Sequence, residues 1–278
     1  MIRNTCDGSA RPPRLRCYLN LMTLEDLPPM EAPLEAIAAA GYEGVQFTEQ
    51  VTAGQAAACA RLGLGKAGAG RVNRPEEAAP LAARFREEGL ECGTLHVGWG
   101  MEDEDEAARL IEAVIEASVR RDLPLYVETH RATVFQDLWR TVQLVRRFPE
   151  LRFNGDFSHW YTGLEMVYGG FERKLAFIEP VLERVRFLHG RIGSPGCIQV
   201  DVGEGESSGR PYVEHFRALW MACWRGFAAS ACPGDYLLFV PELLSPRIYY
   251  AMAAERSDRW AQALVLRRLA REWMRGEG

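Results

Sequence analysis

The sequence predicts an α/β fold in the form of a single (β/α)8 TIM barrel, and three observations support this prediction. First, eight short apolar runs alternate with helix-length segments along almost the whole chain. Second, the length of 278 residues suits one barrel of this kind. Third, no interior stretch has the composition of a linker. We therefore expect one barrel domain over residues 14–278, preceded by a flexible N-terminal tail over residues 1–13.

The expected strands are short and apolar, as strands are when a parallel sheet buries both of their faces. A doubly wound sheet usually has fewer strands and a clear switch point, so eight runs favour a closed barrel. In chain order the runs are Arg16–Leu21, Gly44–Thr48, Leu64–Gly70, Cys92–Gly98, Leu125–Thr129, Arg152–Phe157, Arg186–Arg191 and Tyr236–Leu243.

Between these runs, apolar residues recur every three or four positions, which predicts amphipathic helices. The helix after Asp103 opens with acidic residues, which suit a helix N-terminus. Its expected buried face is Ala107, Leu110, Ile111, Val114, Ile115 and Ser118. Thr133 and Gln136 predict a capping box that opens the next helix, which carries Leu138, Trp139, Val142 and Val145.

A second long helix is expected after Arg210, and a long loop over residues 193–209 precedes it. Loops of this length often serve binding or act as lids. The apolar stripe of this helix is Tyr212, Phe216, Leu219, Trp220, Cys223, Trp224 and Phe227. Packing on the barrel explains the stripe, and a partner site is the alternative.

The segment Gly63-Leu-Gly65-Lys-Ala-Gly68 has the letters of the dinucleotide fingerprint G-x-G-x-x-G. Its context does not fit, because the glycines follow a helical pattern and no helix begins at once after them. We expect a helix C-cap followed by a strand of small residues.

The composition excludes several classes of protein. With 33 Lys and Arg against 38 Asp and Glu, the net charge of −5 gives no support for a nucleic-acid surface. The longest apolar runs are far shorter than the roughly 20 residues that cross a bilayer, and the polar start does not resemble a signal peptide. Seven cysteines without a C-x-x-C pair fit reduced thiols. We therefore expect a cytoplasmic protein with no nucleic-acid or membrane partner.

Ionisable side chains stand at the ends of the last four expected strands. The segments are Leu-Tyr-Val-Glu128-Thr-His130, Phe-Asn-Gly-Asp156-Phe-Ser-His159, Phe-Leu-His189-Gly-Arg191 and Phe-Val-Pro-Glu242-Leu. In a barrel the carboxyl ends of the strands form one ring, and active sites lie there. We therefore expect Glu128, Asp156, His189 and Glu242 to converge.

Three carboxylates at one place would repel one another, so their ionised forms need a compensating cation. Oxygen-rich ligation with one imidazole suits one divalent ion, with Mn²⁺ favoured and Mg²⁺, Co²⁺ or Zn²⁺ as alternatives. A polar layer of salt bridges to Arg131 and Arg191 would be a purely structural explanation.

Residues two apart on a strand face the same side. His130 therefore shares the side of Glu128, and Arg191 shares the side of His189. We expect His130 and Arg191 to touch the substrate or to support the ligands. His96, at the end of the fourth strand, is expected to hydrogen-bond the substrate.

This order of Glu, Asp-x-x-His, His and late Glu at strand ends resembles the xylose isomerase-like superfamily of sugar phosphate isomerases and epimerases, over roughly residues 16–273. The resemblance implies that Glu128, Asp156, His189 and Glu242 hold a divalent metal. It also implies that Glu128 and Glu242 are the catalytic acid and base, and that His159 binds the substrate.

Two positions depart from the ketose epimerases. Where they carry an arginine six residues beyond the metal-binding histidine, this chain has Pro195, so Arg191 or Arg210 would have to substitute. Where they carry a second glutamate six residues beyond the first, this chain has Val134. These departures leave the substrate open.

The leading hypothesis is a metal-dependent sugar or sugar phosphate isomerase or epimerase. It would transfer a proton through an enediolate on a small hydroxy-carbonyl substrate. A dehydratase or lyase of the same superfamily begins with the same proton abstraction. Less favoured are a DNA-repair enzyme similar to endonuclease IV, which would need more histidines than the five present, and a non-catalytic barrel. The expected partner is a small molecule, and a homo-oligomeric state is left open.

Overall fold

The computed structural model describes residues 1–27, 30, 32–205, 209–250 and 258–275, and eight parallel strands form a closed barrel. Each strand pairs with the next along the chain, and β1 pairs with β8. The strands are β1 (Arg14–Asn20), β2 (Gly44–Phe47), β3 (Gly65–Val72), β4 (Cys92–Val97), β5 (Leu125–Glu128), β6 (Phe153–Gly155), β7 (Val185–Gly190) and β8 (Tyr236–Pro241). Each of the eight predicted runs overlaps one of these strands, so the single (β/α)8 barrel is confirmed. β1 and β7 begin before the predicted runs, and β3 extends beyond its run to Val72.

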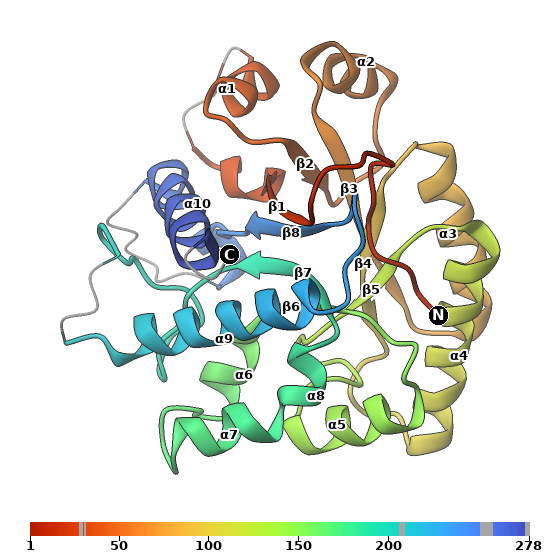
Figure 1. Cartoon of the computed structure of the whole chain (residues 1–278), viewed down its shortest axis with the longest axis vertical. Helices are drawn as coiled ribbons and strands as arrows, with labels where there is room; N and C mark the ends of the chain where they lie inside the picture. The colour runs from red at the N-terminus through yellow and green to blue at the C-terminus, as the bar shows by residue number, and fades with distance from the viewer. Residues whose placement is uncertain (28–29, 31, 206–208, 251–257, 276–278) are drawn as a thin grey trace.

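Helices surround the strands (Figure 1). They are α1 (Pro33–Ala39), α2 (Ala53–Leu62), α3 (Ala78–Glu87), α4 (Glu104–Arg121), α5 (Leu138–Arg147), α6 (Phe157–Gly163), α7 (Phe171–Phe177), α8 (Glu179–Leu182), α9 (Pro211–Ala228) and α10 (Arg259–Arg275). Short 3₁₀ helices occupy Leu21–Leu24, Pro75–Glu77 and Pro246–Ile248. α10 packs against β1 and β8, and α9 packs against β7. None of the helices in the described residues is long and apolar enough to cross a membrane.

Helices α4 and α9 bury most of the apolar residues that the sequence pattern assigns to their inner faces. The predicted capping box at Thr133 is wrong. Asp137 caps α5 by accepting a hydrogen bond from the Arg140 N–H at 2.8 Å, and Thr133 donates to the carbonyl of His130 instead. The exposed side chain of Trp139 lies off the packing face.

The glycine-rich segment lies between a helix and a strand, which is not the strand–turn–helix of the dinucleotide fingerprint. Gly63 ends α2 in the left-handed conformation at φ 68°, and Gly65 begins β3 directly afterwards. This is the C-cap and strand that the sequence predicts. Residues 193–205 and 209 belong to the connection from β7 to α9, and the remainder of that predicted loop, 206–208, lies outside the described residues.

Alternate strand residues point into the barrel. Its amino-terminal half is filled by an apolar cluster of Ile2, Tyr18, Ala67, Cys92, Tyr126, Phe187, Tyr236, Leu238 and Val240. Five of these strands carry a polar residue two positions after their last apolar residue in this cluster, on the same inward face. These polar residues are Asn20, Thr94, Glu128, His189 and Glu242. The interior is therefore apolar near the amino ends of the strands and polar near their carboxyl ends.

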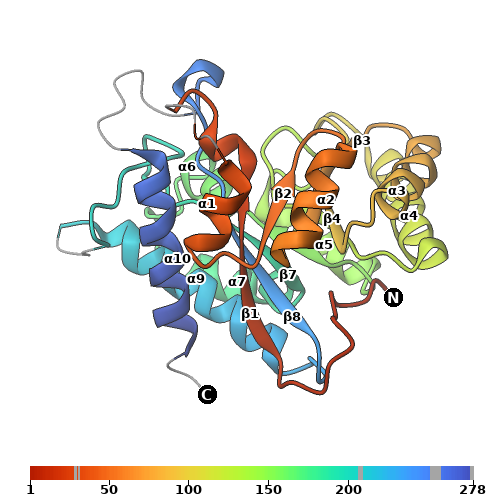
Figure 2. The ribbon, with the colours of Figure 1, turned by 90° about the horizontal axis from the view of Figure 1, so that it is seen from above.

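Residues 1–13, expected as a flexible tail, lie against the amino-terminal end of the barrel, where Figure 2 shows them passing the ends of β1 and β8. Ile2 and Thr5 are buried. Thr5 Oγ1 forms a 2.7 Å hydrogen bond with the Tyr126 hydroxyl, and the Tyr236 N–H donates to the Thr5 carbonyl at 3.0 Å. The segment packs there because it covers apolar and polar groups that the strands leave open at that end.

Candidate metal centre and active site

The four side chains expected as metal ligands meet at the carboxyl end of the barrel. Glu128 ends β5, Asp156 follows β6 as the N-cap of α6, His189 lies in β7, and Glu242 follows β8. His189 Nδ1 lies 3.5 Å from Glu128 Oε2, 3.9 Å from Asp156 Oδ2 and 3.5 Å from Glu242 Oε2. Three buried or nearly buried carboxylates therefore surround one imidazole nitrogen.

A chain of hydrogen bonds fixes which nitrogen of His189 carries the proton. The Met22 N–H donates to Asn20 Oδ1 at 2.9 Å, so the Asn20 amide must direct its NH₂ at Gln46 Oε1, 3.0 Å away. Gln46 Oε1 is therefore an acceptor, and His189 Nε2, at 2.9 Å, donates to it. The lone pair of a neutral His189 is then on Nδ1, facing the carboxylates.

Asn154 positions two of these groups, Glu128 and His189. Its Oδ1 accepts the backbone N–H of His189 at 3.1 Å, which directs its NH₂ toward Glu128 Oε2 and His189 Nδ1, each 3.1 Å away. On the other side of the cluster, Asn20 Nδ2 donates to Glu242 Oε1 at 2.8 Å. Both asparagines are fully buried. The ligand-type groups are thus held in place by a second layer of amides.

Arg191 lies within the cluster, on the side expected from strand parity. Its guanidinium pairs with Asp156 and lies 3.4 Å from Glu242 Oε2. Its Nε donates to Ser158 Oγ at 3.0 Å, and one of its amino groups lies 3.2 Å from His159 Nε2. Its other amino group, Nη1, is buried and has no hydrogen-bond partner among the described residues.

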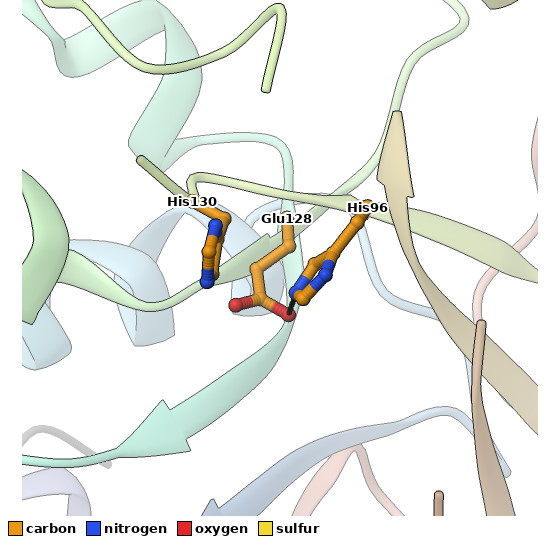
Figure 3. Close-up of side chains that lie close together, drawn as sticks. All are labelled: His96, Glu128 and His130. Atoms are coloured by element: carbon orange, nitrogen blue, oxygen red, sulfur yellow. Dashed lines mark ion pairs between the residues drawn. The ribbon is translucent and has the colours of Figure 1, made fainter. Parts of the chain in front are cut away.

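Three histidine rings form a row beside Glu128, and Figure 3 shows two of them, His96 and His130, flanking its carboxylate. The ring centroids of His96 and His130 lie 4.1 Å apart, and those of His130 and His159 lie 3.8 Å apart. His96 Nε2 lies 3.4 Å from Glu128 Oε2, and His159 Nε2 lies 3.9 Å from Glu128 Oε1. All three histidines expected at the substrate side are therefore at the site.

The tautomers of these rings separate donors from acceptors. Arg71 has only N–H donors and lies 3.1 Å from His96 Nδ1, so a neutral His96 carries its proton on Nε2 and donates toward Glu128. His130 Nδ1 donates to the carbonyl of Arg131, which leaves Nε2 as an acceptor, 3.1 Å from the Tyr250 hydroxyl. His96 is thus poorly suited to bind a metal, and His130 offers its lone pair at Nε2.

The two glutamates differ in their affinity for protons. Burial alone raises the pKa of Glu128, but His96 and His189 more than offset it, and the pKa lies well below its usual value. Burial raises the pKa of Glu242, and His189 and Arg191 oppose this only in part. Burial lowers the pKa of His189, yet Glu242 and Glu128 bring it to about 9. Without a metal, a proton on His189 therefore offsets part of the carboxylate charge.

Burial lowers the pKa of His130 to about 3, with Glu128 opposing the shift, and it lowers the pKa of His159 well below its usual value. Both rings are therefore neutral near pH 7. They contribute hydrogen-bonding capacity to the site without adding positive charge.

The residues present fit a divalent metal. Asp156, His189 and Glu242 offer ligand atoms that all lie within 4.8 Å of one another, and so do Glu128, Asp156 and His159. The Nδ1 lone pair of His189, with Nε2 tied to Gln46, is the arrangement expected of a metal-binding imidazole. The salt-bridge alternative holds only for Arg191. Among the described residues no carboxylate pairs with Arg131, whose guanidinium lies over the Tyr250 ring.

Several residues at the site have no counterpart in the sequence-based expectation. Asn20, Gln46, Thr94, Asn154, Ser158, Arg71 and Tyr250 all contact the groups described above or their partners. The available signal was an uncharged polar residue in, or at the end of, an otherwise apolar strand, as in Asn20 and Asn154.

No family model and no curated protein matches the chain, whereas solved structures do. IOLI protein with a bound zinc atom has 10% identity and a TM-score of 0.61, with 95% of this chain and 99% of that one covered. A xylose isomerase-like TIM barrel protein from Mycobacterium smegmatis, in complex with magnesium, has 12% identity and a TM-score of 0.60, with 96% and 98% covered.

The probable 3-DHS dehydratase AsbF from Bacillus anthracis has 12% identity and a TM-score of 0.58, with 92% of this chain and 98% of that one covered. At these identities the likeness concerns the fold. The chain has the fold of the xylose isomerase-like TIM barrels.

Proposed function

We propose that this protein is a divalent-metal-dependent isomerase or epimerase that moves a proton on a small hydroxy-carbonyl compound. The observation that carries the proposal is the convergence of three carboxylates on His189 Nδ1 at the carboxyl end of the barrel. Active sites of (β/α)8 enzymes are built at this end. Solved structures with the same fold include one with a bound zinc atom and one in complex with magnesium.

Glu128, Asp156, His189 and Glu242 would hold the ion. Oxygen-rich ligation favours Mn²⁺ in our proposal, with Mg²⁺, Co²⁺ and Zn²⁺ as alternatives. When bound, the ion supplies positive charge that acidifies the C–H next to a carbonyl group. All seven cysteines are free thiols, in keeping with a cytoplasmic location.

The protein's own residues would then divide the proton transfer between them. Glu242 would accept the proton, since burial already raises the pKa of its carboxyl group in the metal-free protein. Glu128 is held ionised by His96 and His189 and would exchange a proton on the opposite side of the substrate. His130 Nε2, His159 and Arg191 lie beside these carboxylates and would bind the oxygens of the substrate.

A dehydratase is the second candidate, and the row of histidines favours it. Loss of water after proton abstraction needs a group that protonates the departing hydroxyl. Two proton donors lie along this row: His96 Nε2–H, 3.4 Å from Glu128 Oε2, and the Tyr250 hydroxyl, 3.1 Å from His130 Nε2. One fold neighbour is described as a probable dehydratase.

Solvent deuterium exchange tests both candidates. Purified protein is first analysed for bound metal, then stripped and reloaded with each ion separately. Ketoses, inositol ketones and hydroxy acids are incubated with the loaded protein in D₂O and followed by proton NMR. We expect metal-dependent loss of a C–H signal in at least one compound. A product that keeps the carbon skeleton and all oxygen atoms of the substrate identifies an isomerase or epimerase. A new vinyl or conjugated signal in the product identifies a dehydratase. A protein that binds no divalent ion would refute both.

A further inference from the structure

The rim of the site near β3 and β4 carries an arginine, Arg71, that does not contact the four proposed metal ligands. Arg71 is in the second-last position of β3 and faces the barrel interior, because it is four residues beyond the inward-facing Ala67. It pairs in register with His96 of β4. The two residues therefore stand side by side at the carboxyl end of neighbouring strands.

The guanidinium of Arg71 is held in one orientation. Its Nη1 donates a hydrogen bond to the Gly98 carbonyl at 2.7 Å, and its Nη2 donates to His96 Nδ1 at 3.1 Å. Its Cζ lies 3.9 Å from the centre of the Trp99 ring. Stacking on an aromatic ring fixes the plane of the guanidinium while its edge remains available to a ligand. A preorganised donor loses less entropy on binding than a free side chain.

Arg71 is half-buried, and no Asp or Glu in the described part of the chain forms an ion pair with it. Burial lowers the pKa of Arg71, and the more distant carboxylates of Glu128 and Glu102 only partly oppose this. Arg191, in contrast, already pairs with Asp156 and approaches Glu242. A partly buried charge without a counter-ion is unfavourable and is usually matched by a partner. A ligand can supply that partner.

The charge of the loaded site points the same way. The charged groups that act on one another here include four carboxylates and three guanidinium groups. The carboxylates are Glu102, Glu128, Asp156 and Glu242, and the guanidinium groups belong to Arg71, Arg131 and Arg191. A divalent ion would bring this set to one net positive charge. A substrate with one negative charge would neutralise it, whereas a neutral sugar would not.

The site is also accessible on this side. The side chain of His96 is 32% exposed, whereas those of His159 and His189 are 0% and 2% exposed. Trp99, on which Arg71 stacks, is half exposed. A substrate that enters beside His96 therefore meets Arg71 first and Glu128 next, with one imidazole ring between them.

From these observations we infer that Arg71, with His96 and Trp99, forms a subsite for an anionic group of the substrate, either a carboxylate or a phosphate. This inference builds on the proposed function by naming the substrate class: a small hydroxy-carbonyl compound with an anionic group at the end away from the metal. Arg191 Nη1 and His159 Nδ1, two buried nitrogens without described partners at the other end of the histidine row, would serve the oxygens nearer the metal.

The test uses ligands that share a hydroxyketone unit and differ in charge. Hydroxyacetone is neutral, hydroxylevulinate adds a distal carboxylate, and dihydroxyacetone phosphate adds a phosphate. Dissociation constants are measured by NMR titration on Mg²⁺-loaded and metal-free protein. We expect at least one anionic ligand to bind about tenfold more tightly than hydroxyacetone, which corresponds to one charge-assisted contact. The preferred anion distinguishes carboxylate from phosphate.

Variants assign the effect to Arg71. R71Q should abolish the difference in affinity between the anionic ligand and hydroxyacetone, and R71K should keep part of that difference. R109Q, which neutralises an exposed arginine on α4, is the matched control and should behave like the parent. Circular dichroism and the melting temperature show whether each variant folds, and R71K gives an answer if R71Q does not fold.

The subsite is refuted if charged and neutral ligands bind equally to the parent, or if R71Q keeps the full advantage of the anion. A parent protein that binds no divalent ion would refute the proposed function alone. In the metal-free protein the advantage of the anionic ligand should be smaller, because the charge of the ion is missing, but R71Q should still reduce the affinity for that ligand if the subsite exists. The two conclusions can therefore fail separately.

Discussion

His189 and Gln46 are 143 residues apart in the chain, yet His189 Nε2 and Gln46 Oε1 form a 2.9 Å hydrogen bond inside the barrel. Gln46 is itself oriented by Asn20 and Thr94, through contacts of 3.0 and 3.1 Å. This bond sets the tautomer of His189 and leaves its Nδ1 to the three carboxylates. A side chain outside the proposed set of ligands thereby controls which nitrogen of His189 faces the carboxylates.

Gln46→Leu should weaken divalent metal binding by about 10–100-fold, the usual effect of removing a partner of a metal-binding histidine. Without the acceptor, His189 is free to place its proton on Nδ1. Gln46→Glu keeps an acceptor oxygen at the same position and should bind metal much more tightly than Gln46→Leu. Calorimetric titration of the stripped proteins measures both affinities. Equal affinities in the parent and Gln46→Leu would show that this hydrogen bond does not set the tautomer.

Glu242→Gln should weaken metal binding and lower turnover by at least about 10²–10⁴-fold, the contribution of a general base. Gln keeps the volume of Glu242 and its contact with Asn20 but removes the charge. Proton exchange into a verified substrate, measured on metal-saturated protein, tests the role. Unchanged exchange would exclude Glu242 as the base and transfer the role to Glu128.

The same variant should raise the stability of the metal-free protein. Burial raises the pKa of Glu242, which means that the folded state disfavours its charged form at neutral pH. Gln resembles the protonated form. The melting temperature of metal-free Glu242→Gln at pH 7 should therefore exceed that of the metal-free parent, and a lower value would show that the charge is needed by His189 and Arg191.

His159→Ala should leave the metal in place and impair use of the substrate. His159 lies beside Asp156 and Glu128 at 3.5 and 3.9 Å, but its Nε2 is already occupied by Arg191. We expect metal affinity within a few-fold of the parent and a reduced kcat/KM. His159→Gln, which fills more of the space, controls for the cavity. Loss of metal in both variants would instead make His159 a ligand.

The strands were predictable because strands buried on both faces are nearly continuous apolar runs. The candidate ligands followed from them, because Glu128, Asp156 and Glu242 are charged residues directly after such runs. The two-residue period of a strand then indicated that His130 shares the side of Glu128 and that Arg191 shares the side of His189.

The residues that support the ligands were not predictable in the same way. A single Asn or Gln near a strand end is equally common in turns, and the contact between Gln46 and His189 depends on which strands face each other across the closed barrel. Arg71 was missed for another reason. The expected strand ended at Gly70, whereas β3 continues to Val72, which places Arg71 on the inward face.

Thr5 and Tyr126 test whether the amino-terminal segment is part of the barrel. Their hydroxyl groups are buried and form a 2.7 Å hydrogen bond. Thr5→Val leaves the Tyr126 hydroxyl with only a weak 3.4 Å contact to the Arg3 carbonyl, and should cost about 1–3 kcal/mol of unfolding free energy. Urea denaturation measures the cost.

Tyr126→Phe completes a double-mutant cycle. When both hydroxyls are absent, neither is left buried without the other, so the double variant should be more stable than the sum of the single costs predicts. Additive costs would mean that the two groups do not interact, and an unchanged stability of Thr5→Val would mean that residues 1–13 are the flexible tail expected from the sequence.

His215 on α9 gives the protein a pH-dependent stability that is separate from the metal cluster. Its ring stacks on Phe171, with centroids 3.9 Å apart, and its Nδ1 lies 2.8 Å from the Tyr161 hydroxyl. Burial lowers the pKa of His215, and the nearby carboxylates of Glu172 and Glu214 only partly oppose this. The folded protein therefore holds His215 neutral more strongly than the unfolded chain does.

Because its folded-state pKa lies below the unfolded value of about 6.5, the stability contribution of His215 is complete above pH 6.5. It is lost as the pH falls from there through the folded-state pKa. His215→Gln cannot be protonated, so the melting temperature of the variant should fall less than that of the parent between pH 7.5 and pH 5. The other titratable groups are present in both proteins and cancel in this comparison. A difference in melting temperature between the two proteins that stays constant over this range would show that His215 titrates as it does in the unfolded chain, and that its contact with Tyr161 does not depend on its neutral form.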